Sequence, residues 1–534
     1  MDKKTLLAVV LSVMVLFTYQ TFFAPKKPVT APKAAPAGES VNKNGSPSPV
    51  QEQNPTLKAE LTATPSDIKE KEITVNTRLY QAVFTTKGGT LKSFRLKNYR
   101  KTQAKDAELI ELVHVMKGMP GPLAVSFPES DIAAPADAMY EAETTDLDLI
   151  KMPKQNRLTL SRTYPSQMKV EKIFTFSPDG YNLELEVRVH NLSTAPINQK
   201  AMLSWHEYVD PAKESDSYSH DGPVVLVAKS IEREDVKEIE KEKLYGPNVS
   251  WGGFESKYFI AAMVPQNPSL TSLAVSKDGN NMVSTSLKGQ KNPIPVGQAG
   301  LFSYTLFLGP KDYSILKTLR IGLEDAIDFG SWMKWLAMPM LIFLKYINNL
   351  VNNYGLAIII LTILIKIIFW PLGNKSYRSM KEMQKLQPKM QELREKYKDD
   401  KQRIGQETMA LYKAHKVNPM GGCLPMVIQI PVFFGLYKTL LYAIELRHAP
   451  FFWWLQDLSD KDPYYITPII MGITMFAQQK MSPQAGDPMQ QKVMLLMPVI
   501  FTVLFLNFPS GLVIYWLFNN ILSIGQQYFI IKQK

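Results

Sequence analysis

Polar and apolar residues change their period along the chain. Between about residues 58 and 320 they alternate, so that every second position is apolar over stretches such as Leu183, Leu185, Val187 and Val189. A period of two is that of a strand with one buried face. Roughly the last 200 residues are instead dense in long apolar runs. The alternation predicts an all-β domain, and the runs predict membrane-spanning helices.

A hairpin is predicted near the middle of the alternating region. Two strand-like stretches, residues 173–176 and 182–189, are joined by Ser177-Pro178-Asp179-Gly180. Proline fixes one φ angle in such a turn and glycine permits a positive one. Similar stretches recur at intervals over residues 58–320, with Gly, Pro and Asn between them. This pattern favours a large antiparallel β-sandwich.

The N-terminal region predicts an anchor followed by a tether. Residues 5–23 are uncharged and follow Lys3 and Lys4, the pattern of a signal sequence. Cleavage after Ala24 would require Phe22 where a small residue is preferred, so residues 1–23 are interpreted as an uncleaved anchor. Residues 24–57 contain seven prolines and few large apolar residues, which is typical of a flexible linker.

The period returns to a helical one after the β region. Residues 321–355 carry apolar and aromatic side chains beside charged ones, notably Ile327, Phe329, Trp332, Trp335 and Leu336. Tryptophan favours the depth of the membrane interface, which predicts an amphipathic interfacial helix. A simple lead-in to the next span is the alternative.

Five further spans are predicted within residues 356–534, and the N-terminal anchor makes six. They are Leu356–Leu372, Cys423–Leu446, Tyr464–Gln478, Val493–Phe508 and Leu512–Ile531. Three of them have only 15–17 residues, which is about 23–26 Å of helix against a hydrocarbon core near 30 Å. Local thinning of the bilayer is the expected response.

Charge predicts the orientation of these spans. The segment 374–418 carries twelve Lys and Arg residues against six acids, whereas the connection 447–463 has two basic residues and three acids. Because positive segments stay inside, both termini and segment 374–418 are expected in the cytoplasm and the β domain outside it. This topology explains the net charge of +12, and no nucleic-acid-binding motif accompanies that charge.

The basic segment 374–418 has a helical pattern of its own. Apolar residues recur at steps of three and four from Met380 to Tyr397, followed by a polar break and a second apolar-patterned stretch from Ile404 to Ala414. We expect two antiparallel helices in a cytoplasmic hairpin, with a kink or a restart at Pro388.

The residue types exclude two kinds of chemistry. The single cysteine, Cys423, allows no intrachain disulfide, and the six histidines lack the spacing of metal ligands. No metal site and no cofactor is expected. His206 and Glu207 are adjacent on a predicted strand, so their side chains should point to opposite faces.

Polar residues within the predicted spans are the candidates for function. Lys366 lies in an otherwise uncharged run, where a lysine at the centre of a lipid-exposed helix costs roughly 2.5–3.5 kcal/mol. Thr362 lies one helical turn away on the same face. Other spans carry Gln429, Lys438, Asn507, Asn519, Asn520, Ser523 and Gln526. These residues indicate a polar cavity among the helices, and snorkelling of Lys366 toward the cytoplasm is the simpler alternative.

Several long motifs resemble one family. They are Asn418-Pro419-Met420-Gly421-Gly422-Cys423-Leu424-Pro425, Gln429-Ile430-Pro431-Val432-Phe433, Asp462-Pro463-Tyr464-Tyr465, Asp487-Pro488-Met489-Gln490-Gln491-Lys492 and Phe508-Pro509-Ser510-Gly511-Leu512. In this order they closely resemble the YidC membrane insertases of Gram-negative bacteria. The resemblance covers the anchor, a large periplasmic domain and a five-span core.

The resemblance implies a non-enzymatic insertase and chaperone of the bacterial inner membrane. Its expected partners are nascent membrane proteins, the Sec translocon, the ribosome or its RNA near the hairpin, and membrane lipids. The implied hydrophilic groove contains Lys366, Thr362 and Trp516, beside the polar Gln429, Asn519 and Ser523. The implied hydrophobic slide contains Phe433, Met471 and Leu504. The family residue at Lys366 is usually arginine, and the residue at Trp516 is often tyrosine.

Two other functions are weighed. Lys366 is a possible base of a Ser–Lys intramembrane hydrolase with Ser510 or Ser523 as nucleophile, although nothing in the sequence brings either serine near it. A secondary transporter is the other alternative, but no inverted repeat is visible.

Overall fold

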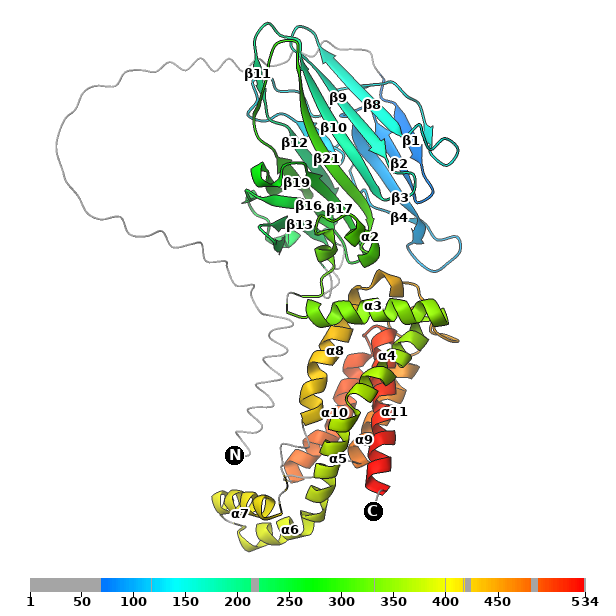
Figure 1. Cartoon of the computed structure of the whole chain (residues 1–534), viewed down its shortest axis with the longest axis vertical. Helices are drawn as coiled ribbons and strands as arrows, with labels where there is room; N and C mark the ends of the chain where they lie inside the picture. The colour runs from blue at the N-terminus through cyan, green and yellow to red at the C-terminus, as the bar shows by residue number, and fades with distance from the viewer. Residues whose placement is uncertain are drawn as a thin grey trace, which may run out of the picture.

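The computed structural model describes residues 69–534, except 117, 213–219, 331, 399, 416, 418–423, 482–487 and 533–534. A β-rich part stands at one end and a group of helices at the other (Figure 1). The predicted anchor 1–23, the linker 24–57 and the motif around Cys423 lie outside the described residues.

A nine-stranded antiparallel sheet forms one layer of the β-rich part. Its strands, in spatial order, are β14 (Ser230–Arg233), β13 (Gly222–Val227), β16 (Val249–Glu255), β17 (Phe259–Pro265), β21 (Ala299–Pro310), β10 (Asn182–Asn191), β9 (Met168–Phe176), β8 (Arg157–Tyr164) and β6 (Glu141–Ala142).

Two five-stranded sheets and one strand pair complete the domain. One sheet contains β4 (Leu109–Glu111), β3 (Thr90–Arg100), β2 (Tyr80–Thr85), β1 (Glu72–Asn76) and β7 (Leu147–Asp148). The other contains β15 (Lys243–Tyr245), β18 (Ser272–Lys277), β19 (Met282–Lys288), β12 (Met202–Tyr208) and β5 (Ala124–Ser126), and β11 (Ile197–Gln199) pairs with β20 (Asn292–Ile294).

The predicted hairpin is confirmed as β9 and β10. The two strands are antiparallel, with Leu183 opposite Phe176 and Leu185 opposite Phe174. These side chains are buried, whereas the intervening Glu184 and Glu186 lie outside the core. The alternating pattern therefore predicted correctly which residues of this strand are buried, because successive side chains of a strand point to opposite faces of the sheet.

Helices form most of the remaining described residues. They are α2 (Tyr313–Thr318), α3 (Lys334–Val351), α4 (Tyr354–Ile368), α5 (Trp370–Lys385), α6 (Gln387–Lys396), α7 (Lys401–Ala414), α8 (Leu424–Tyr442), α9 (Ile466–Met481), α10 (Pro488–Phe505) and α11 (Ser510–Lys532). Short 3₁₀ turns are η1 (Val236–Glu238), η2 (Pro268–Leu270), η3 (Leu323–Ala326) and η5 (Ile444–Leu446).

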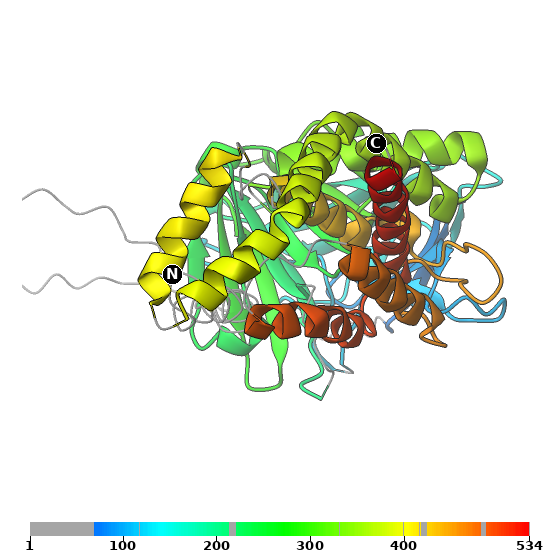
Figure 2. The ribbon, with the colours of Figure 1, turned by 90° about the horizontal axis from the view of Figure 1, so that it is seen from below.

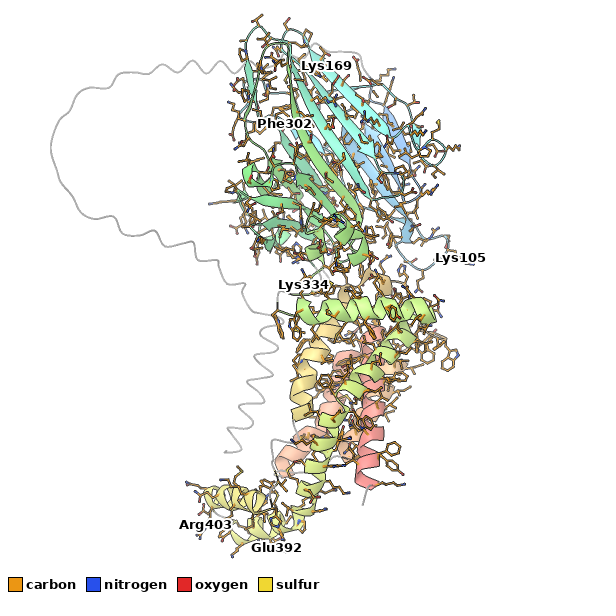
Figure 3. The ribbon with its side chains drawn as sticks, in the orientation of Figure 1. Lys105, Lys169, Phe302, Lys334, Glu392 and Arg403 are labelled. Carbon is orange, nitrogen blue, oxygen red and sulfur yellow. The ribbon has the colours of Figure 1, made fainter. Side chains whose placement is uncertain are left out.

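The amphipathic helix begins later than the sequence pattern suggested. Ile327 and Phe329 are buried but precede the helix, which starts at Lys334. Gly330 has a positive φ of 77°, which does not fit a right-handed helix. Asp328 is held by an ion cluster that is described below. The chain therefore forms a turn at these residues, and the helix begins after it. The helix α3 then crosses above the other helices, with Lys334 at its start (Figures 1 and 3).

The apolar run 356–372 is broken within its last turn. The helix α4 ends at Ile368 and α5 begins at Trp370, with Pro371 in the first turn of α5 and the two axes bent by 65°. Proline is tolerated in a first turn because its missing N–H has no intrahelical partner there. Among the described helices, only this bent pair together reaches the length and apolarity of a membrane span.

The segment 374–418 folds largely as helices α5, α6 and α7. Pro388 lies in the first turn of α6, so the helix restarts near this proline as expected. Met383, Leu386, Met390 and Tyr412 form a small separate core between these helices. Figure 2, seen from below, shows α6 and α7 displaced to one side of the other helices. Glu392 and Arg403 lie on this displaced pair in Figure 3.

Candidate functional site

Lys366 lies in the last turn of α4 and is held by α11. Its Nζ atom donates to Asn519 Oδ1 at 3.2 Å and to Ser523 Oγ at 2.7 Å. Asn519 and Ser523 are four residues apart, so α11 presents both oxygens on one face. The structure therefore brings together three of the residues that the sequence assigned to a polar groove.

Within the described residues, no carboxylate is paired with the Lys366 ammonium. Its two bonds are to neutral oxygens, which satisfy N–H donors without cancelling the charge. An ammonium has three donors, so one remains for another partner. The site is thus prepared for an anionic or strongly accepting group.

Ser523 lies beside Lys366, contrary to the sequence argument that nothing brings them together. Its hydroxyl donates to Asn519 O at 2.7 Å and accepts from Lys366. The serine hydroxyl is therefore already engaged with the backbone of α11, and the Lys366 ammonium is a donor to it. Ser510, the other candidate nucleophile, donates to Asp457 O at 2.8 Å at the opposite end of α11.

Thr362 and Gln429 are placed near the same region by different helices. Thr362 is 1% exposed, and its hydroxyl donates to Ile358 O at 2.7 Å within α4. Gln429 is half-buried on α8, where its side chain interacts with Tyr515 of α11. Neither is bonded to Lys366 within the described structure: Thr362 precedes it by one turn of α4, and the partner of Gln429, Tyr515, precedes Asn519 by one turn of α11.

Trp516 joins an aromatic cluster and not the polar site. Its ring lies 4.8 Å from Phe433, 5.3 Å from Phe505 and 5.9 Å from Phe501, measured between centroids. Phe433 in turn stacks on Tyr437. The indole thus ties α11 to α8 and α10, and it groups with the residues predicted for the hydrophobic slide.

The other two slide residues differ in their exposure. Leu504 on α10 is 51% exposed, and its neighbour Val503 is 62% exposed. Met471 on α9 is fully buried, and its carbonyl accepts from Thr474 Oγ1 at 2.7 Å. Leu504 is therefore accessible at the surface, whereas Met471 belongs to the packing between α9 and α11.

The bend between α4 and α5 has its own polar support. Gln526 on α11 is 3% exposed, and its Nε2 donates to Trp370 O at 3.1 Å and to Asn374 Oδ1 at 2.9 Å. Gly373 lies directly beneath this amide, where an added Cβ would approach Nε2 to 2.7 Å. No local pattern pointed to Gly373, because its importance depends on a side chain about 150 residues away.

Lys438, another polar residue of a predicted span, lies at the junction with the β-rich part. Its Nζ is 3.8 Å from Asp328, which also lies 3.9 Å from Arg233 of β14. Burial raises the pKa of Asp328, but these two cations outweigh burial and hold the pKa below its usual value. Arg233 also pairs with the buried Glu255, which extends the cluster into the β core.

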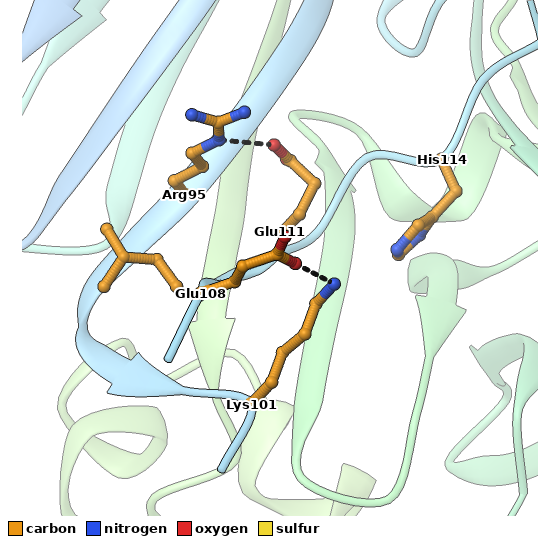
Figure 4. Close-up of a pocket in the computed structure, with 6 residues that line it drawn as sticks. Arg95, Lys101, Glu108, Glu111 and His114 are labelled. Atoms are coloured by element: carbon orange, nitrogen blue, oxygen red, sulfur yellow. Dashed lines mark hydrogen bonds and ion pairs between the residues drawn. The ribbon is translucent and has the colours of Figure 1, made fainter. Parts of the chain in front are cut away.

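The β-rich part has a polar cavity of about 400 Å³ lined by Arg95, Lys101, Glu108, Leu109, Glu111 and His114 (Figure 4). Arg95 pairs with Glu111, and Lys101 pairs with Glu108. The opposite charges in its wall are therefore already paired. Lys105 lies on the connection between Lys101 and Glu108 (Figure 3).

His206 and Glu207 point apart, as expected for adjacent strand residues. His206 Nδ1 lies 2.8 Å from Ser284 Oγ, and burial lowers the pKa of His206 to about 4. Glu207 instead lies 2.6 Å from His114 Nδ1 and accepts from the Trp205 indole at 3.1 Å. Burial raises the pKa of Glu207. The sequence missed this partner because His114 is 93 residues away.

Comparison with known proteins decides the family. A family model described as 60Kd inner membrane protein matches residues 346–534, and one described as YidC periplasmic domain matches residues 72–343. A membrane protein insertase YidC from Syntrophus aciditrophicus (strain SB) is 64% identical over 545 residues, with 100% of both chains covered. The chain belongs to the YidC family of membrane protein insertases.

A second curated relative agrees with this assignment, and two solved structures are similar to parts of the chain. An insertase YidC from Geotalea daltonii (strain DSM 22248 / JCM 15807 / FRC-32) is 42% identical, covering 100% of this chain and 99% of its own. A solved active YidC insertase is 20% identical, covers 86% of this chain and 93% of its own, and has a TM-score of 0.39. A putative aldose 1-epimerase from Escherichia coli K12 is 9% identical, covers 45% of this chain and 99% of its own, and has a TM-score of 0.28.

Family membership fixes the general function. The chain is a membrane protein insertase of the inner membrane with a periplasmic β domain, and it is not an enzyme. The hydrolase and transporter alternatives are not favoured by these relatives.

Proposed function

We propose that Lys366 receives the polar, acidic flank of a nascent membrane protein while its apolar segment leaves along α8 and α10 into lipid. The observation that carries this proposal is the unpaired charge of Lys366, which bonds only to Asn519 and Ser523 among the described residues. A carboxylate of the substrate supplies the negative charge that no described residue of the chain places beside Lys366.

The expected strength of this reception is modest. Two unit charges 4 Å apart attract by about 4 kcal/mol at an effective dielectric constant near 20. Displacing water from both groups offsets much of this gain. A net preference of about 1–2 kcal/mol for an acidic flank is enough to bias entry, and it still allows release.

Release follows the apolar surface beside the polar site. Phe433 and Trp516 form the inner part of this path, and the exposed Leu504 and Val503 lead from α10 to the lipid. Met471 contributes through packing, because it is buried. Partitioning of the substrate's apolar segment into lipid drives the step without nucleotide hydrolysis.

The proposed topology has six spans, with both termini and the α5–α7 hairpin in the cytoplasm. The charge of segment 374–418, twelve basic residues against six acids, supports this orientation. The break at Phe369 shortens the straight part of α4 to 15 residues, which fits a locally thinned bilayer.

The proposed partners follow from this placement. The basic hairpin suits anionic ribosomal RNA or lipid headgroups, since α6 and α7 carry the exposed cations Lys389, Lys396, Arg403 and Lys413. Nascent chains reach the groove alone or beside the Sec translocon. The ammonium of Lys366 is a point charge, whereas the planar guanidinium of arginine forms two parallel hydrogen bonds to a carboxylate. Recognition of a substrate carboxylate at Lys366 therefore depends on charge and not on a paired hydrogen-bond geometry.

Complementation tests the proposal. Cells depleted of their own insertase should insert a small single-span substrate with an acidic translocated tail when they express this chain. Lys366→Ala should reduce that insertion about 5–30-fold, corresponding to 1–2 kcal/mol, while Lys366→Arg retains it. Equal insertion by wild type and Lys366→Ala, at matched expression, would remove the role assigned to the lysine.

A further inference from the structure

The connection between η5 and α9 displays an aromatic residue in a costly backbone conformation. Trp453 is 83% exposed and has a φ of +50°. Tyr465, at the end of the same connection, has a φ of +56° and is 37% exposed. A bulky residue in the left-handed region costs on the order of 1–3 kcal/mol and persists only where its surroundings enforce it. Both residues therefore destabilise the connection by their backbone conformation, and contacts around them must hold them in it.

Several contacts within the connection close this turn, and Gln103 of the β domain donates to Gln456 O beside it. Phe451 N donates to Leu455 O at 2.8 Å, and Leu455 N donates to Phe452 O at 3.1 Å, which closes the turn around Trp453. The Gln456 side chain donates to Trp453 O. The turn is thus a fixed structure whose tip carries Phe452 and Trp453.

The turn is built on the start of α4. Asn353 Nδ2 donates to Phe451 O at 3.1 Å, and the Phe451 ring lies against Gly355, where an added Cβ would approach the ring to 2.0 Å. Lys366 lies eleven residues beyond Gly355, which is roughly 16 Å along a helix. Because the turn is fixed to the start of α4, the depth of the turn in the membrane also determines the depth of Lys366.

Two of the three acids of this connection bond to their neighbours, whereas Asp460 is exposed. Asp462 accepts from the Trp454 indole at 3.1 Å and from Thr467 N at 2.7 Å, and Asp457 accepts from Ser459 N at 2.8 Å. The tip itself is apolar, with an indole N–H as its polar group. This combination of an apolar ring and one polar atom suits the lipid headgroup boundary.

The tip is continuous with an apolar helix surface. The helix α9 follows directly, and its exposed residues include Ile469 at 50% and Ile473 at 63%. In Figure 1 the connection (orange) lies beside α3 at the end of the helices nearest the β domain, and Figure 2 shows it projecting outward from them. A surface that faces lipid along α9 therefore extends to the turn.

We propose that Phe452, Trp453, Tyr464 and Tyr465 form an aromatic wedge that seats in the outer-leaflet headgroup region and fixes the depth of Lys366. This inference rests on the proposed orientation, with the β domain outside. The partner is the lipid surface, and a protein partner at the wedge is an alternative outcome of the test.

Spin-label accessibility tests the wedge in the full chain. In proteoliposomes of a Cys423→Ser background, nitroxides are attached at positions 453, 473 and 244, and their collisions with oxygen and with a water-soluble nickel chelate are compared. Leu244 is 64% exposed on β15 and serves as the aqueous control, whereas position 473 reports lipid. The oxygen-to-nickel ratio at 453 should be several-fold above that at 244 and below that at 473.

Each other outcome has a defined meaning. A ratio at 453 equal to that at 244 places the turn in water and overturns the wedge, and shielding from both reagents indicates a protein partner and also overturns it. An aqueous ratio at 473 instead contradicts the spanning arrangement of the proposed function. As a check without labels, Trp453→Phe should remove part of the tryptophan emission that brominated lipids quench, and unchanged quenching also counts against the wedge.

Discussion

Gly373 and Gln526 should be coupled, because the glycine leaves the space that the amide occupies. Gln526 donates to Trp370 O and Asn374 Oδ1, and an added Cβ at position 373 would lie 2.7 Å from its Nε2. Gly373→Ala must therefore displace the amide and break both bonds. The two lost bonds cost about 1–3 kcal/mol, at about 0.5–1.5 kcal/mol for each. The helix preference of alanine returns about 0.8–1 kcal/mol, so we expect a net loss of stability of up to about 2 kcal/mol.

The sign of this effect should reverse when the amide is absent. Gln526→Ala itself loses the same two bonds and should cost about 1–3 kcal/mol. With the amide removed, Gly373→Ala meets no obstruction there, and alanine is favoured over glycine inside a helix by about 0.8–1 kcal/mol. The double variant should then be slightly more stable than Gln526→Ala alone.

The assay is unfolding of the purified full chain in mixed micelles, followed for wild type, both single variants and the double variant. Gly405→Ala is the matched control, because Gly405 lies inside α7 with open space around its Cβ position. It should raise stability by a similar small amount in both backgrounds. A Gly373→Ala effect of the same sign and size with and without Gln526 would refute the proposed support of the bend.

Two further outcomes are expected. Lys438→Met should cost about 1 kcal/mol in thermal unfolding, and Asp328→Asn about 2 kcal/mol because it also removes the charge that faces Arg233 at 3.9 Å. The double variant should cost little more than Asp328→Asn alone, because both changes remove the same interaction at 3.8 Å; fully additive losses would contradict a direct pair. The pKa of His206 is about 4 in the fold against an ordinary 6.5, so its contribution is present above pH 6.5 and is lost as the pH falls toward 4. His206→Gln should flatten the fall of the β domain's melting temperature between pH 7 and 5, whereas His415→Gln should not, because His415 follows α7, outside that domain. Identical pH profiles for wild type and His206→Gln would exclude this linkage.

The β9–β10 hairpin and the Lys366 site were predictable for a local reason. Alternation along one strand reports its buried face directly, and a lysine in an apolar run is anomalous without reference to any other segment. The polar residues of α11 were visible in the same way, because Asn519 and Ser523 are costly in lipid wherever α11 lies. Their bonds to Lys366 then connect residues more than 150 positions apart.

What escaped prediction depends on packing between distant segments. The break after Ile368 is stabilised from α11 by Gln526, so the run 356–372 looked like one continuous span. Trp516 was assigned to the groove, yet three phenylalanines on α8 and α10 surround it. Lys438 was grouped with the polar residues of a cavity among the spans, although Asp328, more than 100 positions earlier, pairs with it.

Charge reversal tests the central claim most directly. Lys366→Glu should block insertion of a single-span substrate with an acidic translocated tail, because like charges at this site repel. The same variant should insert a matched substrate whose tail acid is replaced by lysine, at a rate at least several-fold above that for the acidic tail. Rescue by the swapped pair is the result predicted for electrostatic reception at Lys366. Equal failure of Lys366→Glu on both substrates, with the folded protein present at wild-type levels, would contradict it.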